Sequence, residues 1–200
     1  MADRPKQEQQ LVLASQSPRR ADLLHSIGLT FEIVPADIDE SRHRDEPAVE
    51  YVERLAREKA ERIVARHPDA IVLAADTCVA IDDDVLGKPV DHDEARVMLQ
   101  RLSGRDHLVH TGVAIAAHDR IESGVATTAV FFNDLDAATI DWYLTTGEAL
   151  DKAGGYAMQS FGGVFVLAID GSPSNVVGLP LHLVAALARD LGVDLAQFRG

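Results

Sequence analysis

Two adjacent arginines follow a serine and a proline near the start of the chain, in the order Ser17-Pro18-Arg19-Arg20. Ser17 is expected to cap a helix and Pro18 to be its first residue. A proline is tolerated there because the N–H groups of the first turn have no partner within the helix, so the N–H that proline lacks is not missed. Arg19 and Arg20 then lie in the first turn, where the helix dipole disfavours each positive charge by about 0.3–1 kcal/mol. A bound phosphate removes this conflict, so the pattern indicates an anion site. The alternative is two surface arginines that follow a helix cap by chance.

Lys59 is a third candidate for anion binding. A helix expected from Pro47 to about Arg66 carries apolar residues at helical spacing, and Lys59 lies four residues after Leu55 and four before Ile63. This spacing places Lys59 within the apolar stripe, so its ammonium group is expected to point inward, toward an anion. In the alternative, the long stem passes its neighbours and the charge ends in water.

Lys88 is a fourth cation, in the segment Gly87-Lys88-Pro89. Pro89 forces an extended backbone on Lys88, so a rigid loop would present this side chain. The chain contains 15 arginines and only four lysines, of which Lys6 and Lys152 are the other two. A chain that uses arginine for most of its positive charge and keeps lysine at a few positions suggests that a compact ammonium group is needed there. Chance is the alternative explanation for the distribution.

An acidic residue follows a segment typical of a strand buried on both faces, Ala70 to Ala75. The strand is predicted to end at Asp76-Thr77, and open α/β sheets place their binding crevice beyond the strand ends. Asp76 is therefore a candidate for chemistry, the alternative being a residue that caps the next turn. The run Asp82-Asp83-Asp84 resembles a metal cluster, but an exposed hairpin turn is the commoner explanation.

Composition favours one globular domain from residue 11 to 200 with a loose tail at residues 1 to 10. The chain has 200 residues and 46% apolar content, enough for a core without disulfides, and Cys78 is its only cysteine. No apolar run approaches the ~20 residues of a membrane span, and the tail lacks the apolar core of a signal peptide. These features predict a cytoplasmic protein that does not bind membranes.

The net charge of −13 argues against polymeric partners, because such a surface repels both nucleic acid and anionic lipid. A small anionic ligand requires a local cluster of cations. Two other kinds of site are not expected: the eight histidines lack metal-ligand spacing, and no G-x-x-x-x-G-K-[ST] segment indicates a P-loop kinase.

The remaining patterns predict an α/β protein with a mixed, twisted sheet flanked by helices. Helices and strands alternate in the first half and strands follow one another later. The expected strands cover residues 11–14, 31–35, 70–75, 79–81, 85–86, 108–117, 121–132 and 164–169. The expected helices cover residues 18–27, 47–66, about 93–102, a Trp142-containing segment ending near Gly147, and 180–191. A flexible glycine segment is expected over 154–163.

Six motifs in register from Leu11 to the last helix closely resemble the Maf family of nucleoside triphosphate pyrophosphatases. They are Ser15-x-Ser17-Pro18-Arg19-Arg20, Glu40, Arg57-Glu58-Lys59-Ala60, Ala75-Asp76-Thr77, Gly87-Lys88-Pro89 and Asp151-Lys152-Ala153-Gly154-Gly155-Tyr156-x-x-Gln159. The resemblance implies a Maf/ITPase-like fold with two lobes around a central cleft, a homodimer, and a divalent cation. It also implies a hydrolase that cleaves a nucleoside triphosphate between the α and β phosphates.

The resemblance also implies residue roles. Asp76 resembles the family's proton acceptor, and Arg19, Thr77 and Gln159 match positions associated with substrate choice. An ordinary aspartate, with a pKa of ~3.9, is a weak base toward water, so Mg²⁺ or Mn²⁺ held by Glu40 and Asp76 would assist it. Asp37 and Asp39 are alternative ligands in the same loop. The expected substrate-binding residues are Ser15, Arg19, Arg20, Lys59, Thr77, Lys88 and Gln159.

The segment from Asp151 to Gly154 and Gln159 resemble the branch of the family that acts on dTTP and UTP. A glutamine amide offers both a donor and an acceptor to the O4 and N3–H edge of uracil or thymine, but it can rotate to suit cytosine. Ser160-Phe161-Gly162 departs from the usual pattern of this branch. The expected function is therefore removal of dTTP, UTP or modified pyrimidine nucleotides from the nucleotide pool. The alternatives are 7-methyl-GTP hydrolysis and a nucleotide-binding regulator of cell division.

Overall fold

A seven-stranded mixed sheet forms the centre of the computed structural model, which describes residues 9–82 and 84–200. The strand order is β2-β1-β3-β5-β6-β7, and β4 pairs with the far end of β3. β1 runs parallel to β2 and β3, whereas every other pairing is antiparallel. This confirms the predicted mixed sheet. The strands are β1 (Leu11–Leu13), β2 (Glu32–Ile33), β3 (Ile71–Ile81), β4 (Asp84–Leu86), β5 (Asp106–Ala117), β6 (Arg120–Phe132) and β7 (Val166–Asp170).

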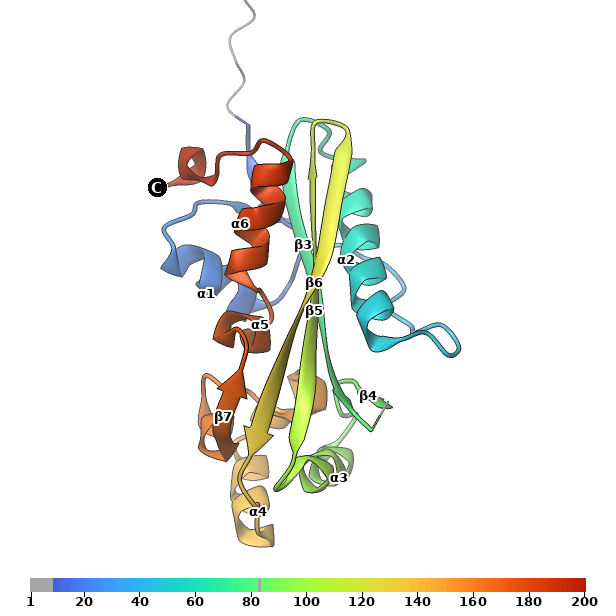
Figure 1. Cartoon of the computed structure of the whole chain (residues 1–200), viewed down its shortest axis with the longest axis vertical. Helices are drawn as coiled ribbons and strands as arrows, with labels where there is room; N and C mark the ends of the chain where they lie inside the picture. The colour runs from blue at the N-terminus through green and yellow to red at the C-terminus, as the bar shows by residue number, and fades with distance from the viewer. Residues whose placement is uncertain (1–8, 83) are drawn as a thin grey trace, which may run out of the picture.

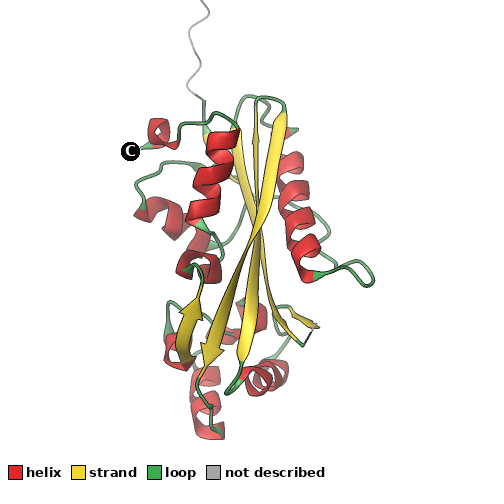
Figure 2. Ribbon diagram, viewed as in Figure 1, coloured by secondary structure: helices red, strands yellow, loops and turns green. Residues whose placement is uncertain are grey.

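Three long strands run the length of the molecule (Figure 1). β3, β5 and β6 contain 11, 12 and 13 residues, and each crosses from one end of the sheet to the other. Helices pack at both ends, as the colouring by secondary structure makes visible (Figure 2). The apolar core is correspondingly divided into three clusters, two at one end of the sheet and one at the other.

One face of the sheet is covered by α2 (Ala48–Val64). The apolar stripe of this helix is buried against alternate residues of β1, β3 and β5. Gly112 of β5 allows the close approach, because a Cβ atom there would lie 2.2 Å from the carbonyl oxygen of Val52. The register of α2 on the sheet is therefore fixed where the helix passes over the middle of β5.

The opposite face carries α1 (Pro18–Ser26), α5 (Pro173–Val177), α6 (Leu181–Asp190) and the short 3-10 turn η4 (Leu195–Phe198). Leu24 of α1, Leu187 of α6 and Phe198 of η4 pack against the same cluster of sheet residues. The predicted helix from residue 180 is confirmed, whereas α5 and η4 are two elements that the pattern of the sequence does not indicate.

The second end of the sheet is packed by α3 (His92–Leu102), α4 (Ala137–Thr145) and the 3-10 turns η1 (Glu148–Asp151), η2 (Ala153–Gly155) and η3 (Phe161–Phe165). This cluster contains four buried aromatic rings. Phe132 contacts Tyr156 with ring centroids 4.8 Å apart, and Tyr143 contacts Phe165 at the same distance. Separate cores at the two ends agree with the predicted two-lobed arrangement.

Three predictions about local structure need correction. Residues 70–75 and 79–81 belong to one strand, β3, so Asp76 lies in mid-strand and not at a strand end. The charge is tolerated because a cation from α2 meets it, as described below. β2 comprises only residues 32–33, and the glycine segment 154–163 forms part of the turns η2 and η3.

Two residues of the acidic run at 82–84 lie where β3 meets β4, because Asp82 follows β3 and Asp84 begins β4. Asp82 accepts hydrogen bonds from Arg105, and Asp84 accepts one from Arg101. These two residues agree with the simpler prediction of an exposed turn, and Asp83 lies outside the described residues. So do residues 1–8 of the predicted tail, including Lys6. Within the described residues, no helix has the length and apolar character needed to cross a membrane.

Candidate active site

A cavity of about 820 Å³ lies where β1 ends and β3 continues toward the second lobe. Its lining includes all the residues that the sequence singles out for binding or catalysis. The structure brings together residues from six separate segments of the chain, which are Ser15, Arg19, Arg20, Glu40, Lys59, Asp76, Thr77, Lys88 and Gln159. No predicted site residue lies elsewhere.

The beginning of α1 forms one wall of the cavity. Ser17 occupies the N-cap position and Pro18 the first turn, as predicted, but the Ser17 side chain makes no capping hydrogen bond. The backbone N–H of Ser17 donates instead to Oγ of Ser15, at 3.2 Å. Arg19 follows within the first turn and lines the cavity.

Arg20 is fixed by three hydrogen bonds. Its Nη1 donates to Oγ of Ser15 at 3.0 Å, its Nε donates to the carbonyl oxygen of Gly178 at 2.8 Å, and its Nη2 donates to Oγ1 of Thr77 at 3.0 Å. Burial lowers the pKa of Arg20, and the charge of Asp76 opposes that shift. Because a guanidinium stays protonated in proteins, the result is an oriented positive charge at the helix N-terminus.

Lys59 points inward from α2 and bridges two carboxylates. Its side chain is 7% exposed, and its Nζ lies 2.6 Å from Oδ1 of Asp76 and 2.6 Å from Oε1 of Glu40. The alternative of a charge that ends in water is thereby wrong. The ion pairs explain both how Lys59 occupies an apolar stripe and how Asp76 occupies a buried strand, since each buried charge has a partner.

Glu40 belongs to a loop that several contacts hold against α2. Burial raises the pKa of Glu40, but the hydrogen bond and charge of Lys59 outweigh it and leave the pKa lowered. Tyr51 donates to the carbonyl oxygen of Glu40 at 3.0 Å. The next carboxylate, Asp39, accepts hydrogen bonds from the hydroxyl and backbone N–H of Ser41. Glu40 is therefore the carboxylate of this loop that reaches Lys59.

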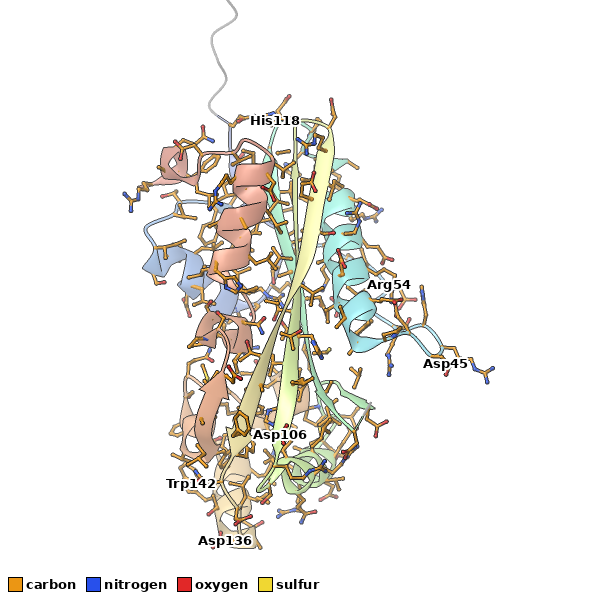
Figure 3. The ribbon with its side chains drawn as sticks, viewed as in Figure 1. Asp45, Arg54, Asp106, His118, Asp136 and Trp142 are labelled. Atoms are coloured by element: carbon orange, nitrogen blue, oxygen red, sulfur yellow. The ribbon has the colours of Figure 1, made fainter. Side chains whose placement is uncertain are left out.

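A second ion pair holds the far end of the same loop. Arg54 of α2 donates to both carboxylate oxygens of Glu46, at 2.7 and 2.9 Å. Figure 3 shows Arg54 close to where α2 meets the loop that carries Asp45. The hydrogen bonds from Arg54 lower the pKa of Glu46 to about 2.

The second lobe supplies the opposite wall. Lys88 and Gln159 are exposed and line the cavity, and the loop that carries Lys88 is fixed by a hydrogen bond from the N–H of Gly154 to the carbonyl oxygen of Gly87. Lys88 contributes to the lowered pKa of Glu40 through its charge, which places both residues in the same electrostatic environment.

Asp151 and Lys152 also line the cavity, although the sequence predicts neither a binding nor a catalytic role for them. Asp151 pairs with the adjacent Lys152 and lies 3.7 Å from Nη1 of Arg19, so an ion pair connects η1 with α1 across the cavity. These contacts lower the pKa of Asp151 against the opposing effect of burial. The scarcity of lysine was the signal that could have identified Lys152.

Charge is balanced along the cavity wall. Five cationic side chains (Arg19, Arg20, Lys59, Lys88, Lys152) face five acidic ones (Asp37, Asp39, Glu40, Asp76, Asp151). A polyphosphate that enters such a cavity brings several uncompensated negative charges, so it requires a further cation. The wall is therefore suited to a complex of polyphosphate and metal ion better than to the polyphosphate alone.

Glu40 and Asp76 fit a divalent cation of the Mg²⁺ type. Such ions are bound in proteins by one or two carboxylates, with water and phosphate oxygens as the other ligands. Both carboxylates converge on Lys59, and each uses only one oxygen in that contact. Among the residues that the structure describes, no group of three or more histidine, cysteine or acidic side chains is arranged to hold a metal ion by itself.

Cys78 also lines the cavity but is not suited to be a nucleophile. Burial, together with the charge of Asp76, raises the pKa of the Cys78 thiol to about 12. A thiol is a good nucleophile only when it is ionised, so Cys78 remains inert at neutral pH. The chemistry of the cavity is therefore that of its carboxylates and cations.

The chain is similar in sequence to several known proteins. The chain is 52% identical over 185 residues to a dTTP/UTP pyrophosphatase from Myxococcus xanthus, covering 92% of this chain and 94% of that protein. It is 47% identical over 186 residues to a dTTP/UTP pyrophosphatase from Syntrophus aciditrophicus, covering 92% and 91%. Among solved structures it is similar to protein VC0702 from Vibrio cholerae, with a TM-score of 0.47, 12% identity, and 94% and 100% coverage.

The family model described as Maf-like protein matches residues 10–191. That span contains β1, where the described fold begins, all the cavity residues, and the helix α6. With the motifs, the cavity and the relatives in agreement, the chain belongs to the Maf family.

Proposed function

We propose that this protein is a metal-dependent pyrophosphatase that hydrolyses dTTP and UTP to the nucleoside monophosphate and pyrophosphate. The observation that carries the proposal is the cavity in which Lys59 bridges Asp76 and Glu40 while Arg19, Arg20 and Lys88 face the same space. The substrate is suggested by the relatives named dTTP/UTP pyrophosphatase at about half identity. Modified pyrimidine nucleotides are included in the proposal, as is a role in clearing the nucleotide pool.

The cationic residues would bind and orient the polyphosphate. Arg19 and Arg20 lie at a helix N-terminus, where backbone N–H groups add to their positive charge. Lys88 reaches the cavity from the second lobe, so the polyphosphate would be held from two sides. Positive charge that surrounds the leaving pyrophosphate stabilises the charge that builds on it, the largest contribution in most phosphoryl-transfer enzymes.

Asp76 would accept the proton of the attacking water. Its Oδ1 accepts a hydrogen bond from Lys59, which leaves Oδ2 to orient a water molecule. Glu40 and Asp76 together would hold the divalent cation, directly or through bound water. When bound, Mg²⁺ or Mn²⁺ supplies charge that neutralises the polyphosphate and makes a bound water more acidic. Water adds across the bond between the α and β phosphates, its proton passes to Asp76, and pyrophosphate leaves.

Gln159 would read the base, because its amide can pair with the O4 and N3–H groups of uracil or thymine. It is exposed and lines the second-lobe wall, on the side of the cavity opposite to α1. The homodimer and the cytoplasmic location that the family resemblance implies belong to this proposal as well.

One assay tests the proposed activity. Purified protein is incubated with dTTP, UTP, CTP, GTP and 7-methyl-GTP, with Mg²⁺, with Mn²⁺ or with a chelator, and both products are identified. We expect monophosphate and pyrophosphate from dTTP and UTP, and no turnover with the chelator. Preferential hydrolysis of 7-methyl-GTP would replace the substrate assignment, and release of inorganic phosphate with a diphosphate would contradict the reaction. Tight nucleotide binding without turnover would favour a regulator of cell division.

A further inference from the structure

Two separate routes connect Arg20 to one short turn, α5. Nε of Arg20 donates directly to the carbonyl oxygen of Gly178, the residue that follows α5. Nη2 donates to Oγ1 of Thr77, which lies 3.0 Å from Oγ1 of Thr111. Oγ1 of Thr111 in turn lies 3.1 Å from the carbonyl oxygen of Asn175. Both routes therefore end on residues 175–178.

The direction of the second route follows from the chemistry of its groups. A carbonyl oxygen only accepts, so the single proton of the Thr111 hydroxyl is donated to Asn175. Thr111 must then accept from Thr77, whose own single proton is used in that bond. Thr77 presents a lone pair to Arg20, which only donates. Every donor points the same way, from the guanidinium to Asn175, and such aligned chains are strengthened by mutual polarisation.

Asn175 fixes the turn to the sheet. Its side chain is fully buried, and its Nδ2 donates to the carbonyl oxygen of Val109 on β5 at 3.0 Å and to Oγ1 of Thr128 on β6 at 2.9 Å. The carbonyl oxygen of Asn175 also accepts from the N–H of Gly178 at 2.9 Å. One side chain therefore sets the position of both oxygen atoms on which Arg20 depends.

The space around Gly178 leaves little freedom in this arrangement. Its φ of +115° is a backbone conformation that favours glycine. A Cβ atom at this position would lie 3.3 Å from Oγ1 of Thr77 and 3.6 Å from Nε of Arg20. The turn, Thr77 and Arg20 are thus in close contact, so a displacement of the turn would be transmitted to the guanidinium.

We propose that Asn175 and Thr111 are positioning residues for Arg20. Neither side chain is part of the cavity wall, and both are fully buried. The inference rests on the proposed function, in which Arg20 binds the polyphosphate. It also assigns Thr77 a different role from the one that the resemblance implies: the Thr77 hydroxyl proton is used within the protein, so Thr77 acts through Arg20 and does not donate to the base.

The test is a double-mutant cycle that measures binding of the non-hydrolysable α,β-imido analogue of dUTP to the full chain by calorimetry. Thr111→Val removes the hydroxyl at nearly constant volume, and we expect it to weaken binding about five- to tenfold. Thr111→Ser keeps the hydroxyl and should restore affinity. In an Arg20→Ala background, Thr111→Val should have almost no further effect, because interacting residues are not additive.

Control variants separate positioning from general destabilisation. Thr127→Val removes a threonine hydroxyl on β6 that bonds to His110, and it should leave affinity unchanged. Asn175→Ala is measured in the same cycle and should follow Thr111→Val, and the Thr111 variants decide the question if Asn175→Ala does not fold. Thr77→Val should lower kcat/KM for dTTP, UTP and CTP by the same factor.

Each outcome has a definite meaning. Two results would overturn the positioning role. In one, the Thr111→Val protein binds the analogue as tightly as the unaltered protein. In the other, Thr111→Val lowers affinity by the same factor whether or not Arg20 is present. A change in the ratio of kcat/KM between bases in Thr77→Val would overturn the role given to Thr77. If Arg20→Ala binds the analogue as tightly as the unaltered protein, then the phosphate-binding role in the proposed function is wrong instead.

Discussion

Nζ of Lys59 lies 2.6 Å from Oδ1 of Asp76, in a contact between a helix and the middle of a buried strand. Neither charge would be stable there alone, because an isolated ion inside a protein loses its hydration. The pair therefore couples the packing of α2 on β3 to the chemistry of the cavity. A substitution at Lys59 should affect both stability and activity.

Lys59→Met should lower the free energy of unfolding by about 3 kcal/mol, because it leaves the carboxylates of Asp76 and Glu40 without their partner. Urea denaturation measures this change. Mg²⁺ should recover more stability in Lys59→Met than in the unaltered protein, since a cation replaces the lost ammonium. Arg57→Met, on the same helix, is the control and should cost less than about 1 kcal/mol. Equal stability of both variants would contradict the argument.

Asp76→Asn should abolish most turnover while nucleotide binding persists. The amide cannot accept the proton of water, so kcat should fall by about 100- to 10,000-fold, the usual contribution of a general base. Pyrophosphate release and binding of the α,β-imido analogue are the two measurements. Asp37→Asn changes an exposed carboxylate of the same cavity and should retain activity within about threefold. Turnover retained by Asp76→Asn would rule out the proposed proton acceptor.

Asp151→Asn should strengthen binding of the product pyrophosphate. In the unaltered protein, the Asp151 carboxylate neutralises Arg19 and Lys152, and both cations become available to an anion when it is removed. Asp151 is two-thirds exposed, so the gain should be only about threefold and should disappear at 1 M salt. Competition binding at low and high salt checks this. Weaker binding would show that Asp151 orients the cations and does not compete with the ligand.

The lowered pKa of Glu46 should make the free energy of unfolding depend on pH. Its pKa is lowered from 4.5 to about 2 by the hydrogen bonds from Arg54. A carboxylate whose folded pKa is lowered stabilises the protein above its unfolded pKa, and this contribution is lost as pH falls from about 4.5 to 2. Glu46→Gln should therefore be less stable by about 1–3 kcal/mol at pH 7 and equal to the unaltered protein near pH 2. A difference independent of pH would contradict the ion pair.

The local sequence pattern is sufficient to predict much of the candidate site. The inward direction of Lys59 follows from helical spacing, and the first-turn position of Arg19 and Arg20 follows from the serine and proline before them. The sequence predicts Asp76 at a strand end, because a charge normally terminates an apolar strand. Its partner lies 17 residues earlier on a helix, so no local pattern indicates that the strand continues.

The contacts around Arg20 could not be predicted for the same reason. Its partner Gly178 is 158 residues away, and Thr111 and Asn175 meet across 64 residues. Each of these residues has an ordinary local explanation: Gly178 is a turn glycine, Thr111 is a strand threonine, and Asn175 is a polar residue of a short helix. Only the folded chain shows that they form a connected set of hydrogen bonds.

The continuity of β3, β5 and β6 through both lobes has a mechanical consequence. Both lobes pack on these three strands, so the sheet itself joins the lobes, where hinged domains are joined by a flexible loop. Opening or closing must flex the sheet itself, which restricts the motion to small amplitudes. The separation of the two cavity walls that would bind a polyphosphate is therefore largely set when the chain folds, before any nucleotide binds.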